Sequence, residues 1–304
     1  MPSRRVAVIG AGAAGLVAAR ELRREGHAPV VFERAAAVGG NWLYDDSPAS
    51  AASAADLLGA GGVHSSLYAS LRTNLPRECM GFLDFPFVPD DGAGTESSYS
   101  GDPRRFPGHA EVLQYLEAFA RRFDLHGLVR FETEVVRVRR DDAGAGWKVS
   151  YCSRKLAHGS SEQEEVFDAV VVCNGHLAEP HIADIAGNHP MSYTPTVTRV
   201  QLSIDTWPGK QMHSHNYRVP DSFHGQVERA EEDGSVVFKD GSRVKADAIV
   251  HCTGYKYNFP FLGDDVGIYV DDNRVGPLYQ HVFPPHLAPH ISFIGLHIKV
   301  RLTC

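Results

Sequence analysis

The clearest alternation between apolar and polar positions lies in the first forty residues. Arg4 to Ile9 is a short apolar run, residues 10–15 contain three glycines, and residues 13–24 mix alanine and leucine with charged side chains. Gly26 and a second apolar run, Pro29 to Phe32, follow. Buried parallel strands are short and continuously apolar, whereas an amphipathic helix needs a longer, periodic stretch. The pattern therefore predicts a strand, a turn, a helix that ends at Gly26, and a second strand.

The same periodicities predict further elements along the chain. From Pro107, apolar residues recur at helical spacing as far as Phe123, with charged residues between them, which predicts an amphipathic helix of core residues. The strands expected after it are residues 129–139, 147–151, 167–175 and 247–255, with a hairpin at residues 236–244. A chain of alternating strands and helices belongs to the α/β class.

The glycines at positions 10, 12 and 15 have the spacing of a dinucleotide-binding fingerprint. Gly10 permits a tight turn, Gly12 lets a pyrophosphate approach the backbone, and Gly15 lets the helix pack against the strand. The following helix directs its positive end at that anion. We therefore expect a nucleotide at this turn rather than an ordinary connection between a strand and a helix.

An acidic residue at the end of the second strand extends the fingerprint. Glu33 lies 18 positions beyond Gly15, where a carboxylate accepts hydrogen bonds from ribose hydroxyls and repels a 2'-phosphate. Arg34 follows it, and Gly39-Gly40-Asn41-Trp42 forms a second glycine segment. This second glycine pair resembles the FAD-binding half of flavoproteins with two dinucleotide-binding domains more than an NAD dehydrogenase.

Composition narrows the class of protein. The chain has 304 residues, 43% of them hydrophobic, and a net charge of −7, which argues against nucleic acid or an anionic membrane as the main partner. It has no apolar run of 18 residues and no signal-peptide pattern, so we expect no transmembrane segment and a cytoplasmic protein. The five cysteines lack CxxC spacing, which excludes a zinc ribbon and a redox disulfide, and no metal site is expected.

Residues 71–87 are dense in polar and aromatic residues. Arg72, Thr73 and Asn74 precede an aromatic cluster, and physical reasoning alone leaves a functional loop and a packed crossover loop equally open. The sequence LRTNLPRECM at 71–80 with Asp84-Phe-Pro-Phe87 closely resembles the flavin-containing monooxygenase family, in particular its plant S-oxygenating branch. Residues 207–217 are similar to the family signature FxGxxxHxxxY, with Trp207 in place of the first Phe and with Gly209, His213 and Tyr217 matching.

The resemblance implies an FAD-binding Rossmann-like fold with a βββ crossover, and NADPH as the cosubstrate. It implies that a C4a-hydroperoxyflavin oxygenates a thioether sulfur or an amine nitrogen with O2, so that no triad, metal or acid–base pair is needed. Asn74 would be the catalytic residue, because its amide both donates and accepts hydrogen bonds. The implied cofactor-binding residues are Gly10, Ala11, Gly12, Ala13, Ala14, Gly15, Glu33, Arg34, Gly40, Asn41, Trp42, Thr73 and Asn74.

The sequence departs from the family in three ways. The second GxGxx[GA] fingerprint, which opens the NADPH-binding domain, is missing, and residues 224–235 are too few for the roughly 30 residues of a βαβ unit. Residues 188–203 match no family motif, and the chain ends at Cys304 without the family's C-terminal helices. We interpret these departures as aberrant splicing or an incorrect gene model rather than a minimal natural enzyme.

The resulting domain prediction has three parts. Residues 1–187 form the FAD-binding domain, residues 188–226 are a linker or insert with the signature segment and a remnant of the NADPH domain, and residues 227–304 return to the FAD-binding domain. We expect weak FAD binding and poor or absent turnover of NADPH, because hydride delivery depends on positioning. The alternatives are a working monooxygenase and a non-catalytic flavin-binding or inert fragment; an NAD-linked dehydrogenase is disfavoured by the second glycine segment.

Overall fold

The fold is described from a computed structural model of the chain. The structure describes residues 2–44, 65–89, 98–99, 104–141, 146–153, 162–181, 210–214, 227–230, 233–238, 241–246, 248–271 and 274–296. The chain divides into two compact units. Unit 1 comprises Met1–Tyr44, Ser70–Ala178 and Lys256–Cys304, and unit 2 comprises Asp45–Ala69 and Glu179–Tyr255. The sequence-based boundaries at residues 187 and 226 remain a prediction.

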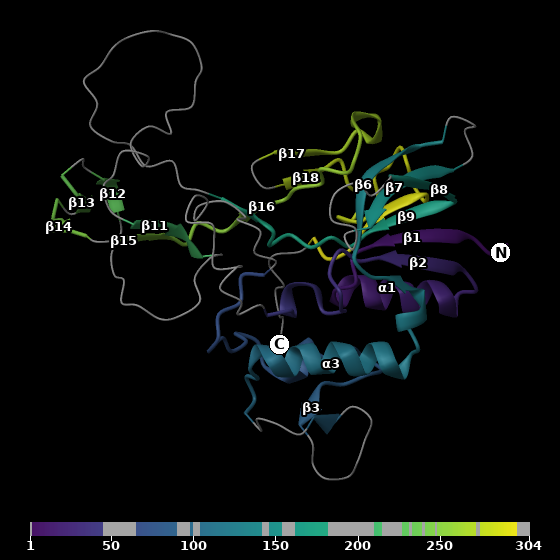
Figure 1. The fold of residues 1–304 in the computed structure, drawn as a ribbon, viewed down its shortest axis with the longest axis horizontal. Helices are drawn as coiled ribbons and strands as arrows, with labels where there is room; N and C mark the ends of the chain where they lie inside the picture. Colours follow the sequence, from purple (N-terminus) through teal and green to yellow (C-terminus); the bar gives the residue numbers. More distant parts are fainter. Residues whose placement is uncertain are drawn as a thin grey trace, which may run out of the picture. The chain divides into compact units, whose positions relative to one another are not determined.

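A five-stranded sheet forms the centre of unit 1. Its order is β19-β9-β1-β2-β5, and every neighbouring pair is parallel (Figure 1). The strands are β1 (Arg5–Ile9), β2 (Ala28–Phe32), β5 (Val129–Arg130), β9 (Ala169–Val172) and β19 (Ile291–Phe293). The predicted first strand, turn and helix are confirmed, because α1 spans Ala13–Arg24. The sheet contains strands that are far apart in the sequence, since β19, near residue 291, pairs with β9 beside β1.

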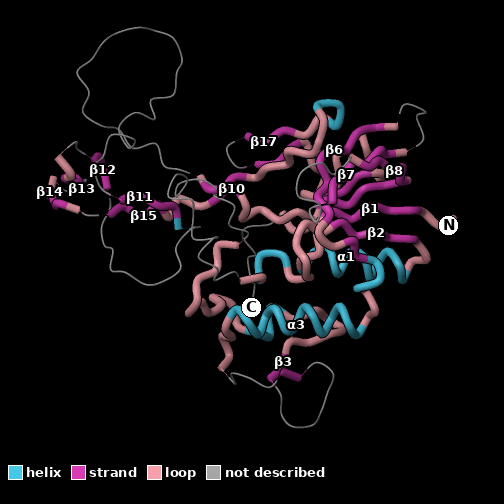
Figure 2. The backbone as a smooth tube through the Cα atoms, in the orientation of Figure 1, coloured by secondary structure: helices cyan, strands magenta, loops and turns pink. Residues whose placement is uncertain are grey.

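Both faces of the sheet are covered, which explains its continuous apolar strands. Val6 and Val8 of β1 pack with Leu16 of α1, whereas Ala7 and Ile9 pack against the antiparallel strands on the opposite face. Figures 1 and 2 show α1 and α3 (His109–Arg122) on one side of the sheet and β6, β7 and β8 on the other. Since neighbouring side chains of a strand point to opposite faces, a strand that is apolar at every position requires this two-sided cover.

The predicted helix after Pro107 is confirmed as α3, and an aromatic cluster packs on it. Phe82, Phe85 and Phe87 contact Tyr115, with ring centroids 4.6 to 5.5 Å apart. The Tyr115 hydroxyl donates to the Phe85 carbonyl at 2.6 Å and accepts from the Phe82 N–H at 2.7 Å. Its burial raises the pKa of Tyr115 to about 12. The aromatic residues that end the predicted polar loop therefore fix that loop to α3.

The antiparallel sheet on the other face is the predicted βββ crossover. It consists of β6 (Thr133–Arg140), β7 (Trp147–Ser153) and β8 (Gln163–Phe167), in that order. The single strand predicted at residues 129–139 is wrong: Val129–Arg130 joins the parallel sheet, and β6 begins only at Thr133. Glu132, at a φ of 52°, turns the chain between the two strands.

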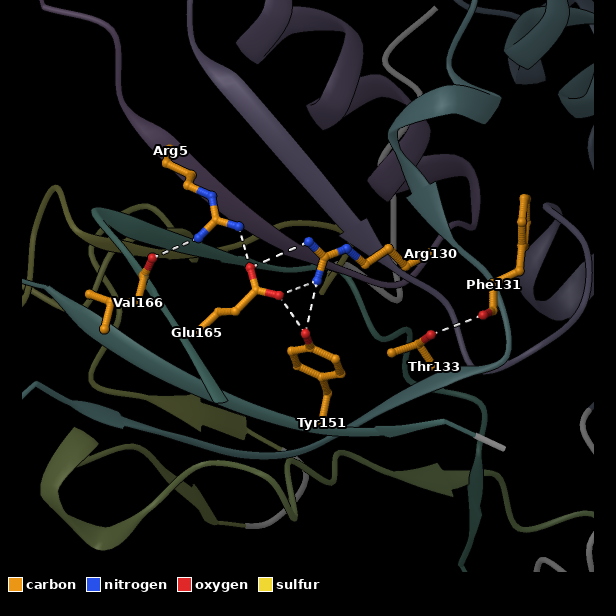
Figure 3. A network of polar contacts seen from close by, with 7 residues as sticks. All are labelled: Arg5, Arg130, Phe131, Thr133, Tyr151, Glu165 and Val166. Atoms are coloured by element: carbon orange, nitrogen blue, oxygen red, sulfur yellow. Dashed lines mark hydrogen bonds and ion pairs between the residues drawn. The ribbon is translucent and has the colours of Figure 1, made fainter. Parts of the chain in front are cut away.

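A partly exposed ion cluster joins the two sheets (Figure 3). Glu165 of β8 accepts hydrogen bonds from Arg5 at the start of β1, Arg130 at the end of β5 and the Tyr151 hydroxyl of β7. The Arg130 hydrogen bond, followed by those from Tyr151 and Arg5, holds the pKa of Glu165 at about 2. These four residues are called the Glu165 cluster below.

The other described elements are short. In unit 1 they are the 3-10 turns η1 (Gly40–Trp42), η2 (His126–Leu128) and η4 (Asp264–Val266), the helix α2 (Arg77–Met80), and the strands β3 (Val88–Pro89), β4 (Ser98–Tyr99), β17 (Tyr269–Asp271) and β18 (Arg274–Gly276). Unit 2 contains a parallel pair, β11 (Lys210–His213) with β15 (Ala248–His251), and β12 (Val227–Ala230), β13 (Ser235–Phe238) and β14 (Arg243–Lys245) in an antiparallel sheet. β10 (Glu179–Pro180) pairs with β16 (Tyr255–Lys256). Over the residues described, no helix is both long and apolar enough to cross a membrane.

Candidate functional site

The glycine turn between β1 and α1 is built so that two of its glycines cannot carry a side chain. Gly10 has a φ of +105°, and a Cβ there would lie 2.5 Å from the Cys173 carbonyl oxygen. A Cβ on Gly15 would lie 1.8 Å from the carbonyl oxygen of Gly10. The backbone of Gly10 is therefore in close contact with Cys173, just after β9, and with Gly15 in the first turn of α1. Gly12 has neither constraint, since a Cβ on it would lie no closer than 3.5 Å to its nearest neighbour, the Cα of Gly40.

The N-terminus of α1 offers free hydrogen-bond donors. The first backbone bond of the helix runs from the Leu16 N–H to the Gly12 carbonyl at 3.0 Å, so the N–H groups of Ala13, Ala14 and Gly15 have no partner within the helix. The N-cap residue is Gly12, it supplies no side-chain cap, and the first turn contains no acidic residue. The free N–H donors and the dipole of α1 together favour the binding of an anion next to Gly12.

The second glycine segment packs directly on the first. The Gly39 N–H donates to the Ala11 carbonyl at 3.0 Å, and a Cβ on Gly40 would lie 2.9 Å from the Cα of Gly12. Both residues have a positive φ, 131° and 56°. Asn41 and Trp42 follow within η1, and Trp42 packs against the apolar core. Two backbone segments without side chains thus meet in direct contact at this point.

Glu33 lies beside this point, buried at 4% exposure. One carboxylate oxygen accepts the Ala11 N–H at 2.7 Å, and the other accepts the Ala35 N–H at 2.8 Å. A carboxylate oxygen can accept more than one hydrogen bond, so a lone pair on each remains for a further donor such as a ribose hydroxyl. The neighbouring Arg34 is exposed. The structure therefore brings Glu33 together with the fingerprint glycines, and leaves Arg34 at the surface.

Thr73 and Asn74 lie on a different loop of unit 1. Thr73 is buried, its N–H donates to the Pro107 carbonyl at 3.0 Å, and its hydroxyl donates to the Leu75 carbonyl at 2.7 Å. Asn74 is exposed, and its side chain makes no hydrogen bond with the described part of the chain. Thr73 therefore shapes the loop, while the Asn74 amide stays available to a ligand.

Sequence reasoning singled out the segment that contains Gly39 but missed Gly295, and both residues lie against the glycine turn or its helix. Gly39 touches Ala11, and a Cβ on it would lie 2.5 Å from Leu113 of α3. Gly295 follows β19 with a φ of +89°, and its Cβ would lie 3.3 Å from the Cβ of Ala14. The available signal for Gly295 was a glycine shortly after an apolar run.

Other polar residues at this edge of the sheet are fixed in place. The Asn174 amide donates to the Asn258 carbonyl at 3.0 Å. Burial lowers the pKa of His176, against the opposing effect of its hydrogen bond to the Gly295 backbone. Burial raises the pKa of the Cys173 thiol to about 12, so this cysteine is not a nucleophile at neutral pH. Of the signature at residues 207–217, Trp207, Gly209 and Tyr217 lie outside the described residues, and His213 ends β11.

Comparisons with known proteins identify a family. The model of the flavin-binding monooxygenase-like family matches residues 3–230 and 224–301. The flavin-containing monooxygenase FMO GS-OX-like 1 of Arabidopsis thaliana is 48% identical over 343 residues, which cover 97% of this chain and 67% of that protein. FMO GS-OX5 of the same plant is 48% identical over 96% of this chain and 69% of its own length.

Solved structures agree in fold. The S-allyl-L-cysteine S-oxygenase from Allium sativum superposes with a TM-score of 0.79 at 45% identity, covering 98% of this chain and 73% of that one. Tmm from Pelagibacter sp. strain HTCC7211 has a TM-score of 0.71 at 20% identity, over 98% and 72% of the two chains, and shows the fold alone.

Proposed function

This chain belongs to the flavin-binding monooxygenase-like family, and we propose that its unit 1 binds FAD for the oxygenation of a soft nucleophile. One observation carries the proposal: Gly12 and Gly40 meet without side chains beside the buried Glu33 carboxylate. This arrangement fits an adenosine diphosphate group. The N–H groups that begin α1 would bind the pyrophosphate, and Glu33 would bind the ribose.

The remaining predicted residues would bind or orient the flavin half. Bound and reduced, the flavin supplies the activation of O2, from which one oxygen atom passes to the substrate. Asn74 would donate to and accept from polar atoms near the flavin ring without releasing a proton, because an amide does not ionise. Thr73 would hold Asn74 through its hydroxyl bond to the Leu75 carbonyl. Gly39, Gly40, Asn41 and Trp42 would close the site around the phosphates.

A thioether is the substrate class that we propose first, with a tertiary or secondary amine second. A soft nucleophile reacts with activated oxygen directly, so the protein need only exclude water and orient the substrate. In support, the Allium sativum protein, 45% identical, is an S-oxygenase of S-allyl-L-cysteine.

NADPH does not fit the described part of unit 2. A dinucleotide fingerprint needs a glycine turn that opens a helix, and none of the described residues of unit 2 is α-helical. The two family matches meet at residues 224–230, and the 343 aligned positions exceed this chain's 304 residues. Both observations support an internal deletion where the second fingerprint is expected. We therefore propose that NADPH reduces this protein poorly or not at all.

Light-driven reduction separates flavin chemistry from NADPH binding. The full chain would be titrated with FAD, reduced either by NADPH or by light with EDTA, and exposed to ¹⁸O2 and a thioether such as S-allyl-L-cysteine. We expect ¹⁸O-labelled sulfoxide after photoreduction and little or none with NADPH, with the Allium sativum enzyme as the control that forms it both ways.

Three other results would change the proposal. Turnover with NADPH at the control's rate would disprove the impairment. FAD binding that yields only hydrogen peroxide would favour a non-catalytic flavin-binding protein, the second candidate, which the lack of a fit for NADPH supports. Failure to bind FAD would disprove the site itself.

A further inference from the structure

A buried ion pair lies directly after the Asn74 loop. The Arg77 side chain is 2% exposed, and its Nη2 lies 2.9 Å from a carboxylate oxygen of Glu111, which is 10% exposed. The same guanidinium donates to the Arg104 carbonyl through Nε at 3.2 Å and Nη2 at 2.8 Å. Its carbon lies 4.9 Å from the ring centroid of Phe87. One side chain therefore joins α2, the segment before Pro107, the first turn of α3 and the aromatic cluster.

The backbone on both sides of Asn74 is tied to the same neighbouring segment. The Thr73 N–H donates to the Pro107 carbonyl at 3.0 Å, and the Arg77 N–H donates to the Arg105 carbonyl at 2.9 Å. The His109 N–H donates to the Leu71 carbonyl at 3.2 Å. Residues 74–76 thus form a short span between two fixed points. Arg77 ends this span, so its side-chain contacts set where the span closes.

α3 connects this span to the nucleotide turn. Glu111, which pairs with Arg77, is two residues before Leu113, whose Cδ1 lies 2.5 Å from the position of a Cβ on Gly39. The rings of His109 and Tyr44 lie 4.9 Å apart. The first half of α3 therefore contacts both the Asn74 loop and the second glycine segment, and sets the separation between them.

A buried ion pair contributes little net stability to a fold. Desolvation of the two charges offsets most of their attraction, and apolar residues of similar volume often replace such pairs without loss of stability. A guanidinium does, however, fix geometry, because its planar donors bind only partners in set directions. The contacts of Arg77 to two separate segments use this property.

We propose that the Arg77–Glu111 ion pair positions Asn74 over the flavin and that this, rather than stability, is its contribution. The inference rests on the proposed function, because it requires Asn74 to contact the flavin. Arg77 and Glu111 are positioning residues: they act through the loop and α3 and do not touch the flavin.

The first test measures amide hydrogen exchange in the Asn74 loop, in the protein without any cofactor. The double variant Arg77→Met/Glu111→Leu removes both charges and leaves neither one buried alone. The control is Arg105→Met/Glu78→Leu, which removes an exposed pair of 3.1 Å between α2 and the segment before Pro107. We expect the first variant to keep its melting temperature within a few degrees while the amides of Thr73 and Arg77 exchange hydrogen at least tenfold faster. The control should exchange at the natural rate, and unchanged exchange in the first variant would disprove the proposal.

The second test uses the reduction potential of bound FAD to determine whether Asn74 lies beside the flavin. Asn74→Asp places a negative charge where we expect the flavin ring, which should make the reduction potential of bound FAD more negative. The substitution is measured in the natural chain, in Arg77→Met/Glu111→Leu and in the control. We expect less than half of the potential shift to remain in the first double variant and all of it in the control.

The outcomes separate this inference from the proposed function. If Asn74→Asp leaves the potential unchanged in the natural chain, the assignment of Asn74 is wrong and this inference fails with it. If the shift is present and persists in full without the ion pair, only the positioning inference is wrong. If the shift and the exchange protection are both lost together, the inference is supported.

Discussion

Gly12→Ala should separate binding of the nucleotide from stability of the fold. The backbone of Gly12 is extended, with φ at −77° and ψ at −173°, a conformation that alanine adopts freely. The added Cβ would meet only Gly40, at 3.5 Å from its Cα and 3.9 Å from its nitrogen, which is ordinary contact. The folded protein therefore accepts the methyl group, whereas a phosphate in contact with the backbone at this point would not.

The size of both effects can be worked out from this geometry. A methyl group at position 12 would displace the phosphate by roughly 1 Å and break at least one charge-assisted hydrogen bond, worth about 1.5–3 kcal/mol. The dissociation constant for FAD should therefore rise about 10- to 150-fold. The loss of a glycine N-cap costs up to about 1 kcal/mol, and the smaller entropy of the unfolded chain returns about 0.4–1 kcal/mol. The melting temperature should shift by no more than about 4 °C.

Fluorescence titration with FAD and thermal denaturation of the FAD-free protein would measure the two quantities. Gly26→Ala at the other end of α1 is the matched control: Gly26 has a φ of +83° and nothing within 4 Å. Alanine there should cost about 1–2 kcal/mol of stability through its left-handed backbone and leave FAD affinity unchanged. If Gly12→Ala binds FAD like the natural chain at an unchanged melting temperature, the pyrophosphate does not lie at this turn.

Three further substitutions test the rest of the site and fold. Gly15→Ala should greatly destabilise the protein, because its Cβ would overlap the Gly10 carbonyl oxygen at 1.8 Å; a melting temperature within about 2 °C of the natural one would contradict the packing of α1. Glu33→Gln turns an acceptor of a backbone N–H into a donor, so it should cost about 1–3 kcal/mol and also weaken FAD binding; loss of stability with unchanged FAD affinity would remove Glu33 from the nucleotide site. The pKa of Glu165 in the folded protein is lowered to about 2 from its ordinary value of 4.5, so its stabilisation is present above pH 4.5 and is lost as the pH falls towards 2. Because its side chain is 25% exposed, solvent screening reduces this contribution to about 1–2 kcal/mol. Urea denaturation between pH 2.5 and 7 should show the loss of stability in the natural chain and not in Glu165→Gln. Equal pH profiles of the two proteins would rule out the Glu165 cluster as the source of the loss.

Local pattern was enough to predict the first part of the fold. The helix at Ala13–Arg24 and the strands on either side of it follow from periodicity and glycine placement, since each depends on contacts that are close in sequence. The same holds for Glu33, because the length of α1 and the turn after it fixes where the second strand ends. Family resemblance added the expectation that the Asn74 loop is functional, because its residues alone could not distinguish it from a packed crossover loop.

Only the tertiary structure decided how distant segments meet. Residues 129–139 are one alternating run, yet pairing assigns Val129–Arg130 to the parallel sheet and residues from Thr133 to the antiparallel one, because strand pairing depends on the partner and not on the run itself. Likewise, nothing local shows that Gly295 lies against Ala14.

The same holds for the site's supporting residues. Arg77 and Glu111 are charged residues, a type that is usually exposed, and they are buried because four segments enclose them. Local backbone preference determined the glycine turn, whereas long-range packing decided which backbone and side-chain atoms surround it. The physical reason is that a turn's conformation depends on its own residues, whereas burial and pairing depend on every segment that packs around it.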